Sequence, residues 1–253
     1  MHRSRPANAP ATAPRLRLAR VLACAAVPVM LVAAGCSSDS GGDKKKESGA
    51  SSSASAPSGG TSSAPAPAPA KFAKLPDPCK ALSQKTIENL VPKAKSKSGT
   101  AGKSSDVSSQ GTCSWNGLDD KGVKGSQYRW LDVSFKRYPS DAAIGSGDQR
   151  AAKEYARLVT TSKSADGAKN VKTTAVSGIG DEATAISYDL NKTDEDFKYA
   201  VIVARTANAV VLLDYNGAGY QGADAPDAGD LMKDAQAAAK EAVASVASAN
   251  GGQ

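Results

Sequence analysis

Residues 183–215, ATAISYDLNKTDEDFKYAVIVARTANAVVLLDY, decide the fold. Three runs rich in β-branched and aromatic residues, 183–190, 197–206 and 210–215, predict three consecutive strands. Residues 207–209 alone separate the last two runs, which favours a tight antiparallel hairpin. A parallel sheet would need a long crossover between successive strands, and these short connections exclude one.

Three further segments predict strands on either side of this unit. Residues 112–115 and 171–176 are predicted as short strands, and residues 128–138 alternate between apolar and polar side chains. Residues 91–109 are rich in Lys, Ser and Gly, so we expect a long exposed loop there.

Three helices are expected around the sheet. The first contains Ile87 and Leu90, with Ser83 as a candidate N-cap and Pro92 as its stop, and the last covers residues 228–249. Apolar residues recur at helical spacing at Ala152, Tyr155, Ala156 and Val159 in the second helix, and at Leu231, Ala235, Ala238, Ala242 and Val246 in the last. The whole pattern predicts an α+β fold, a mainly antiparallel sheet of about five to six strands covered by two to three helices.

The N-terminus has the pattern of an exported protein. Five arginines and no acidic residue precede the end of the apolar run 21–35, which finishes on Ala-Ala-Gly and is followed by Cys36. A basic region, a short apolar region and small residues are typical of a secretory signal. The run is too short for a bilayer, which takes about 20 helical residues. A cysteine in this place is typical of a bacterial lipobox, so we expect cleavage of residues 1–35 and lipidation of Cys36. An ordinary signal peptide with a coincidental cysteine is the alternative.

The lipidated cysteine would begin a tether, residues 36–70, built almost wholly from Ser, Gly, Ala, Pro and Lys. This composition cannot bury enough apolar area to offset its ordering entropy, so we expect disorder. Residues 71–253 then form a single globular domain of ordinary size.

Charge argues against a nucleic-acid partner. The net charge is +7, but removing the five arginines of the leader leaves 27 basic residues (32 less 5) against 25 acidic ones. A nearly neutral domain lacks the basic surface that phosphate backbones require.

Two cysteines remain for the domain. Cys24 lies in the leader, so only Cys79 and Cys113 are left besides the lipidation candidate. Outside the cytoplasm we expect these two to form a disulfide, which contributes about 3–4 kcal/mol in the chain-entropy model. Two buried free thiols are the alternative.

Three motifs carry a family resemblance: Asp-Pro-Cys at residues 77–79, Cys-Ser-Trp at 113–115, and Gly-Ile-Gly-Asp-Glu-Ala at 178–183. Behind a lipobox, they resemble the actinobacterial DPC-motif lipoproteins, a family catalogued as a domain of unknown function (3558). The resemblance covers about residues 75–250 and implies an exported lipoprotein with a disulfide and no established biochemistry. More distantly, the chain is similar to the extracellular sensor domains of mycobacterial-type serine/threonine kinases, although its sequence shows neither a kinase nor a transmembrane helix.

Several kinds of catalytic chemistry are excluded. The only histidine, His2, leaves with the leader, so Ser-His-Asp sets, Cys-His sets and histidine-based zinc sites cannot form. No phosphate-binding loop is present, and the glycine pair Gly178 and Gly180 lacks the third glycine of a dinucleotide site. We expect no enzymatic activity and no cofactor.

Carboxylates offer the remaining chemistry. Asp181 and Glu182 are weak candidates for a hard-cation site, as are the acids at 194–196, since calcium takes clustered oxygen ligands. A glycine turn whose acids face water is the simpler alternative, and we expect no metal.

Aromatic and basic side chains offer binding. Trp115 and Trp130 could stack on a glycan or lipid headgroup, although core positions are the simpler interpretation. Four lysines of the predicted loop could contact anionic envelope polymers or lipids, or simply face water. These are Lys93, Lys95, Lys97 and Lys103.

Two functions remain open. The first is a membrane-anchored lipoprotein on the extracytoplasmic face of the cell membrane, held to the bilayer through Cys36. It would act as a non-enzymatic binding, accessory or sensor-like module, with an envelope protein or cell-wall ligand as partner. The second is an envelope glycan hydrolase that uses carboxylates alone, with Asp181, Glu182 and Asp132 as candidates.

Overall fold

A computed structural model of the chain describes residues 65–252. The expected leader, Cys36 and most of the expected tether lie outside the described residues. The strands are β1 (Thr100–Ala101), β2 (Gln110–Asp119), β3 (Ser126–Arg137), β4 (Lys169–Val176), β5 (Glu182–Lys192), β6 (Glu195–Thr206) and β7 (Ala209–Tyr220). The α-helices are α1 (Gln84–Leu90), α2 (Gly147–Lys163) and α3 (Ala228–Ala249), with short 3-10 helices η1 (Pro78–Lys80) and η2 (Gly122–Lys124).

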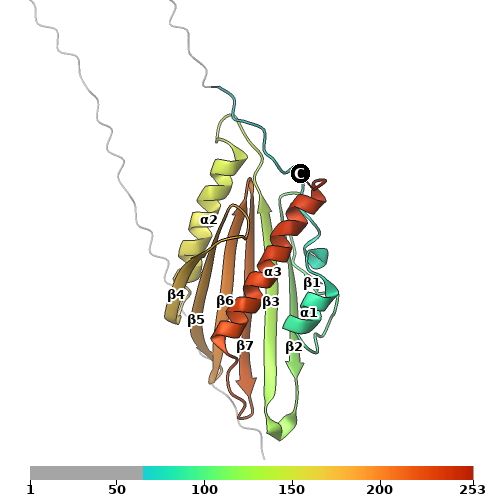
Figure 1. The fold of residues 1–253 in the computed structure, drawn as a ribbon, viewed down its shortest axis with the longest axis vertical. Helices are drawn as coiled ribbons and strands as arrows, with labels where there is room; N and C mark the ends of the chain where they lie inside the picture. Colours follow the sequence, from blue (N-terminus) through green and yellow to red (C-terminus); the bar gives the residue numbers. More distant parts are fainter. Residues whose placement is uncertain (1–64, 253) are drawn as a thin grey trace, which may run out of the picture. The chain divides into compact units, whose positions relative to one another are not determined.

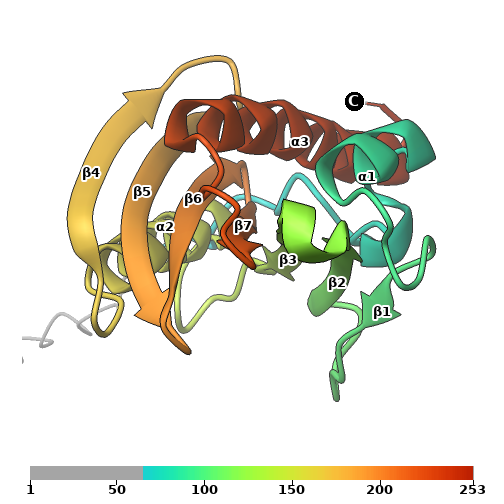
Figure 2. The same ribbon diagram turned by 90° about the horizontal axis from the view of Figure 1, so that it is seen from below.

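The strands form one seven-stranded sheet in the order β1-β2-β3-β7-β6-β5-β4, and every neighbouring pair is antiparallel. Helices α1 and α3 lie on one face of the sheet and α2 lies on the other (Figures 1 and 2). We call these the α3-side face and the α2-side face. The predicted α+β class, with an antiparallel sheet and three helices, is confirmed.

Several strand boundaries differ from the prediction, and β7 covers Ala209–Tyr220 rather than residues 210–215 because its last residues are rich in glycine. Strand β1 lies inside the stretch predicted as a loop, because two residues are too few to show an alternating pattern. Strand β2 runs for ten residues rather than four, since its glycines and polar residues hide its length. The polar segment between β5 and β6 is almost wholly strand, and only Thr193 and Asp194, both with positive φ, form the turn.

Helix α3 supplies most of the core on the α3-side face. Its bounds match the prediction, and Asp227 caps it by accepting a hydrogen bond from the Asp230 backbone N–H at 2.9 Å. The predicted stripe is buried and packs in one cluster with Ile202 of β6 and Leu213 of β7. This helix is therefore held by the burial of many small side chains rather than a few large ones.

Helix α2 uses most of the predicted stripe, since Tyr155 and Val159 pack against the buried residues of the α2-side face. Ala156 is exposed, whereas Ala151 and Glu154 are buried. The prediction was wrong for Ala156, and it missed Glu154 because it counted apolar residues only. A carboxylate occupies the buried side of this helix, and basic partners satisfy it there.

The predicted disulfide between Cys79 and Cys113 is confirmed, with a Cα–Cα distance of 5.2 Å. It joins η1 to β2, and Cys113 is fully buried. Ser83 caps α1 as predicted, since its hydroxyl accepts a hydrogen bond from the Thr86 backbone N–H. Among the helices of residues 65–252, none combines the length and the apolar character that crossing a membrane requires.

Asn208, in the turn between β6 and β7, fastens the start of the domain to the sheet. Its side-chain oxygen accepts from the Phe72 backbone N–H at 2.8 Å, and its amide donates to the carbonyls of Phe72 and Tyr138 at 2.9 Å. Asn250, after α3, bonds the backbone of Lys74. The first described residues and the end of the last helix therefore meet at one end of the strands (Figure 1).

Candidate binding site

The α2-side face is only partly covered. Helix α2 packs mainly on β6, β7 and β5, so the rest of this face is left without a helix among the described residues. Two cavities open there. One, of about 310 Å³, lies beside α2, and we call it the helix-side pocket. The other, of about 690 Å³, lies at the end of the strands away from Asn208, and we call it the aromatic cavity.

Six of the ten residues that line the aromatic cavity are aromatic. Strand alternation puts all the lining residues on one face of the sheet, because the numbers of successive lining residues on any one strand differ by two or four. The lining consists of Tyr128 and Trp130 from β3, Tyr188, Leu190 and Lys192 from β5, Phe197 and Tyr199 from β6, and Asp214, Asn216 and Tyr220 from β7.

The rings pack on one another in two groups. Tyr188 and Tyr199, which are cross-strand partners, are stacked with centroids 4.7 Å apart and planes within 10°. Tyr128, Phe197 and Tyr220 make edge-to-face pairs at 6.0–6.4 Å. Phe197 and both stacked tyrosines are buried, whereas Trp130 and the other two rings are half-buried at the rim. The cavity thus has a rigid aromatic floor and a partly exposed aromatic rim.

Lys192 lies over the aromatic floor. Its ammonium is 5.0 Å from the centroid of Tyr199 and 5.7 Å from that of Phe197, and it donates to the Tyr199 hydroxyl at 2.5 Å. Both ring contacts are within the range of cation–π attraction. The cation site of this aromatic group is therefore already filled by the chain itself.

A pair of carboxylates belongs to the same face. Asp214 of β7 and Asp132 of β3 are direct cross-strand partners. Burial raises the pKa of Asp214 to about 6, the hydrogen bond from the Asn216 amide at 2.8 Å opposes this, and the charge of Asp132 adds to it. Burial also raises the pKa of Asp132, against hydrogen bonds from Ser134 and Thr112. The charge of Asp132 thus opposes the ionisation of Asp214.

Several polar atoms of the cavity are free to meet a ligand. Within residues 65–252, no hydrogen-bond partner meets the indole N–H of Trp130 or the hydroxyls of Tyr188 and Tyr220. No buried side-chain polar atom in that range is left without a partner, so these groups are accessible to solvent instead. The cavity combines ring surfaces with donors and acceptors, as sites for small polar ligands do.

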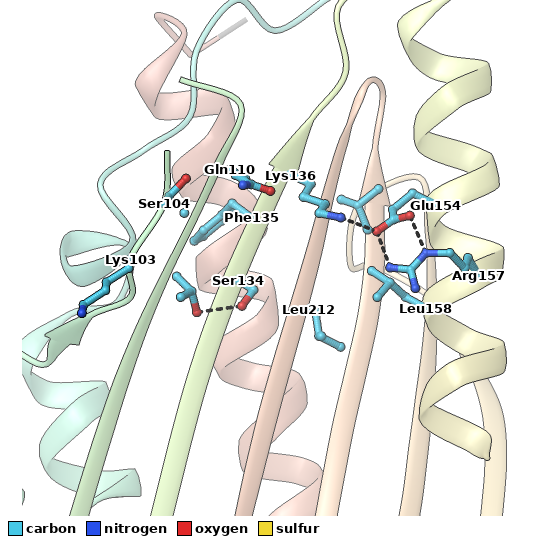
Figure 3. Close-up of a pocket in the computed structure, with 13 residues that line it drawn as sticks. Lys103, Ser104, Gln110, Ser134, Phe135, Lys136, Glu154, Arg157, Leu158 and Leu212 are labelled. Carbon is cyan, nitrogen blue, oxygen red and sulfur yellow. Dashed lines mark hydrogen bonds and ion pairs between the residues drawn. The ribbon is translucent and has the colours of Figure 1, made fainter. Parts of the chain in front are cut away.

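The helix-side pocket has an apolar base and a charged rim (Figure 3). Leu158, Val210 and Leu212 are among its apolar lining residues. At the rim, the Glu154 carboxylate accepts from Arg157 at 2.7 Å and from Lys136 at 2.9 Å, as the dashed lines in Figure 3 show. The hydrogen bonds from Arg157, together with those from Lys136, lower the pKa of Glu154 to about 2. Both oxygens of the Glu154 carboxylate therefore accept hydrogen bonds from these partners.

The predicted acidic candidates Asp181 and Glu182 serve the chain's own structure. Asp181 accepts from the Ala207 backbone N–H at 2.6 Å and lies 3.6 Å from Arg205, and Glu182 pairs with the same arginine. They stand by the β6–β7 turn, whereas Asp132 lies opposite Asp214, five residues beyond Ala209, or roughly 16 Å along β7. The structure does not bring the three carboxylates together.

The two tryptophans have different positions. Trp115 is in the core, with 2% of its surface exposed, and its indole N–H donates to the Lys97 carbonyl at 3.3 Å. Trp130 lines the aromatic cavity. Of the loop lysines, Lys97 pairs with Glu88 at 2.9 Å, and Lys103 lines the helix-side pocket. Lys93 and Lys95 are exposed.

No metal centre is evident in the described part of the chain, where no group of three or more His, Cys, Asp or Glu side chains is placed to hold an ion. The acids at residues 194–196 belong to the β5–β6 hairpin, and Asp196 accepts from Asn191 at 3.1 Å. The Asp132–Asp214 pair is the remaining carboxylate group of interest.

Sequence reasoning missed Asp214 and the aromatic cavity. The alternation of tyrosine and phenylalanine on β5 and β6 was a usable signal, because Tyr188, Phe197 and Tyr199 had to share one face. Tyr128 and Trp130 of β3 could not be assigned, since nothing local places β3 beside β7, and Tyr220 lay beyond the predicted end of its strand at residue 215.

A family model described as a protein of unknown function (DUF3558) matches residues 31–188, which is more than half of the chain. The chain belongs to this family. No curated protein matches the chain. Among solved structures, that of LpqN, described as involved in cell envelope biogenesis of Mycobacterium tuberculosis, is similar at 15% sequence identity, over 51% of this chain and 68% of that one. The TM-score is 0.29, too low to carry an argument about fold or function.

Proposed function

We propose that this DUF3558 protein is an exported, lipid-anchored binding module of the cell envelope, and that it binds its ligand on the α2-side face of the sheet. The anchor would be Cys36, at the junction of leader and tether, and the module would stand on the extracytoplasmic face of the membrane. In this role the protein is not an enzyme.

The observation that carries the proposal is the aromatic cavity. A domain of this size needs its large rings in the core, yet six aromatic residues line one open cavity of about 690 Å³. Three of these rings, Tyr128, Trp130 and Tyr220, are only half-buried and stay partly exposed to water at the rim. Such an arrangement is favoured when the rings have a ligand to bind.

Two related roles are weaker. A sensor-like role is implied by the distant resemblance to kinase sensor domains. It would use the same cavity, but it would need a partner protein that responds when a ligand binds there. A hydrolase built on Asp181 and Glu182 has no support from the geometry, because Arg205 holds both carboxylates. Two free acids at a suitable separation are what that chemistry requires.

The anchor is tested by metabolic labelling. Cells that express the chain are grown with radiolabelled palmitate, beside cells that express Cys36→Ala. We expect label and membrane association for the first, and neither for the variant. Equal labelling of both proteins, or recovery of the unprocessed chain from the cytosol, would contradict the proposed anchor.

The binding site is tested by the indole resonances of the chain's two tryptophans. Trp130 lines the cavity and Trp115 is in the core, so each spectrum contains its own control. We expect at least one class in a library of saccharides, peptides, ammonium compounds and fatty acids to shift the Trp130 resonance and leave that of Trp115 unchanged. A library without any such compound would count against the site.

A further inference from the structure

The aromatic cavity also restricts the chemistry of its ligand, provided that the proposed binding function holds. We propose that it binds an uncharged saccharide, whose C–H faces stack on the aromatic rings while its hydroxyls bond the polar groups of β7 and β5. The charges and polar groups of the cavity disfavour cationic, anionic and purely apolar ligands.

A cationic ligand is disfavoured by Lys192. Aromatic sites for quaternary ammonium groups use ring faces to attract the positive charge. Here the ammonium of Lys192 already lies 5.0 Å from the Tyr199 centroid and 5.7 Å from that of Phe197. A second cation would meet this charge at short range in a partly desolvated site, where repulsion is strong.

An anionic or purely apolar ligand is disfavoured by the carboxylates. Asp214 lines the cavity, and its cross-strand partner Asp132 lies next to it on the same face. The two carboxylates outnumber the single ammonium of Lys192, so a ligand carboxylate or phosphate would meet a lining of net negative charge. A hydrocarbon chain would remove the half-buried Asp214 carboxylate from water without giving its second oxygen a hydrogen bond, at a cost of about 1–3 kcal/mol.

An uncharged saccharide can interact with both the aromatic rings and the polar groups of the lining. The edge-to-face pairs among Tyr128, Phe197 and Tyr220 each cover one face of one ring, so other ring faces remain for C–H contacts. The Asp214 carboxylate uses one oxygen for the Asn216 amide at 2.8 Å and keeps the other as an acceptor for a hydroxyl. Lys192, whose ammonium donates to the Tyr199 hydroxyl, has further donor hydrogens. A cavity of about 690 Å³ lies inside the range of about 300–1,000 Å³ for ligand sites.

The test is a titration of the full chain carrying Cys36→Ser, followed through the two indole resonances. The probes are maltotriose, mannotriose and chitotriose as neutral saccharides, glucuronate as an anionic sugar, tetramethylammonium as a cation, and octanoate as an apolar anion. We expect at least one neutral trisaccharide to shift the Trp130 resonance in a saturable way, while the three charged probes leave it unchanged.

Variants locate the contacts. Asp214→Asn and Tyr220→Ala are each expected to weaken saccharide binding at least tenfold. Asp189→Asn, on the opposite face of β5, is the matched control and should leave affinity unchanged. Circular dichroism of each variant establishes that it is folded, and Asp214→Asn preserves the side-chain shape if the tyrosine variant does not fold.

The outcomes separate the two proposals. If tetramethylammonium, octanoate or glucuronate shifts Trp130 and no neutral sugar does, the saccharide inference is wrong and the binding function stands. If no probe shifts Trp130, the saccharide inference is wrong, and a negative result with the wider library then overturns the binding function as well. Unchanged saccharide affinity in Asp214→Asn would overturn the role of the carboxylate.

Discussion

Asp214 shows how strongly the surroundings of a side chain can shift its pKa. Its pKa is about 6 in the folded chain, against 3.8 for an ordinary aspartate, chiefly because of burial. The folded state therefore keeps its proton to a higher pH than the unfolded state does. Stability is lost as the pH rises from about 4 to 6, and the loss persists above that range.

We expect Asp214→Asn to raise the free energy of unfolding at pH 7 by on the order of 1–2 kcal/mol. A shift of two units would correspond to about 3 kcal/mol, but the side chain is only half-buried and solvent screens part of it. Urea unfolding at pH 4 and pH 7 measures the effect, which should be near zero at pH 4. A variant that loses stability at pH 7 would show that the carboxylate is stabilised where it lies.

The pKa shift of Glu154 has the opposite sign to that of Asp214. Hydrogen bonds from Arg157, and those from Lys136, lower its pKa to about 2 against an ordinary 4.5. Its contribution is present above pH 4.5 and is lost as the pH falls towards 2. We expect Glu154→Gln to lower the free energy of unfolding by about 1–2 kcal/mol at pH 7, since both basic partners are partly exposed.

The measurement for Glu154→Gln is urea unfolding at pH 7 and pH 2.5, with Asp148→Asn on the same helix as a control. Asp148 is exposed near the start of α2, and its variant should change stability by a few tenths of a kcal/mol. If Glu154→Gln had equal effects at both pH values, the ion pairs would not be the cause.

Local residue chemistry was largely predictable. The cap at Ser83 and the pairing of Cys79 with Cys113 followed from neighbours in sequence or from elimination. The Asp132–Asp214 pair could not be predicted, because 82 residues separate its members and only the register of β3 on β7 brings them together. Non-local register decides such sites.

Elements are held partly by crosslinks rather than by their own contacts. The disulfide closes a loop with a sequence separation of 34 and holds η1 against β2. We expect the double variant Cys79→Ala/Cys113→Ala to lose about 3–4 kcal/mol of unfolding free energy, through the larger entropy of the unfolded chain. Urea unfolding of this variant, beside the oxidised wild type, measures the loss.

The double variant should retain the fold, because η1 is short and the sheet does not depend on it. The reduced wild type is the control and should match the variant. A loss well under 1 kcal/mol would mean that the unfolded chain is already restricted around this loop.

Elements with a strong period were predicted well, and those without one were not. Helix α3 matched residue for residue because its alanines and aliphatic residues repeat at helical spacing. Strand β1 has two residues and no period, so the sequence could not reveal it. Helix α2 was found with most of its stripe, but its buried Glu154 was missed, since a charged residue does not add to an apolar pattern.

The whole molecule depends on a few contacts between distant parts of the chain. Asn208 is fully buried and makes three hydrogen bonds, two of them to Phe72, which is 136 residues away. We expect Asn208→Ala to lower the free energy of unfolding by about 2–4 kcal/mol, because it leaves buried backbone groups of Phe72 and Tyr138 without partners.

Hydrogen exchange with urea unfolding tests this expectation. The Phe72 amide should exchange much faster in Asn208→Ala, with little change in the amides of α3. Asn250→Ala is the control, since it removes similar bonds from an exposed site and should cost less. Unchanged protection of Phe72 in Asn208→Ala would show that other contacts hold this segment.

The order of strands is the part of the fold that no local pattern predicts. The hairpins β2–β3, β5–β6 and β6–β7 join neighbours along the chain, whereas β3 beside β7 joins strands from the two halves of the domain. This one non-local pairing completes the aromatic cavity, because Tyr128 and Trp130 come from β3 and the remaining rings come from β5, β6 and β7.

The first described residues and the aromatic cavity lie at opposite ends of the strands. Phe72 is fastened at the β6–β7 turn, and Tyr220 lies eleven residues beyond Ala209, or about 36 Å at the rise of an extended strand. The proposed lipid anchor would therefore join the domain at the end of the strands that is farther from the cavity, and would leave the cavity uncovered by its own attachment. A partner arriving from the medium could reach the rings without displacing the membrane.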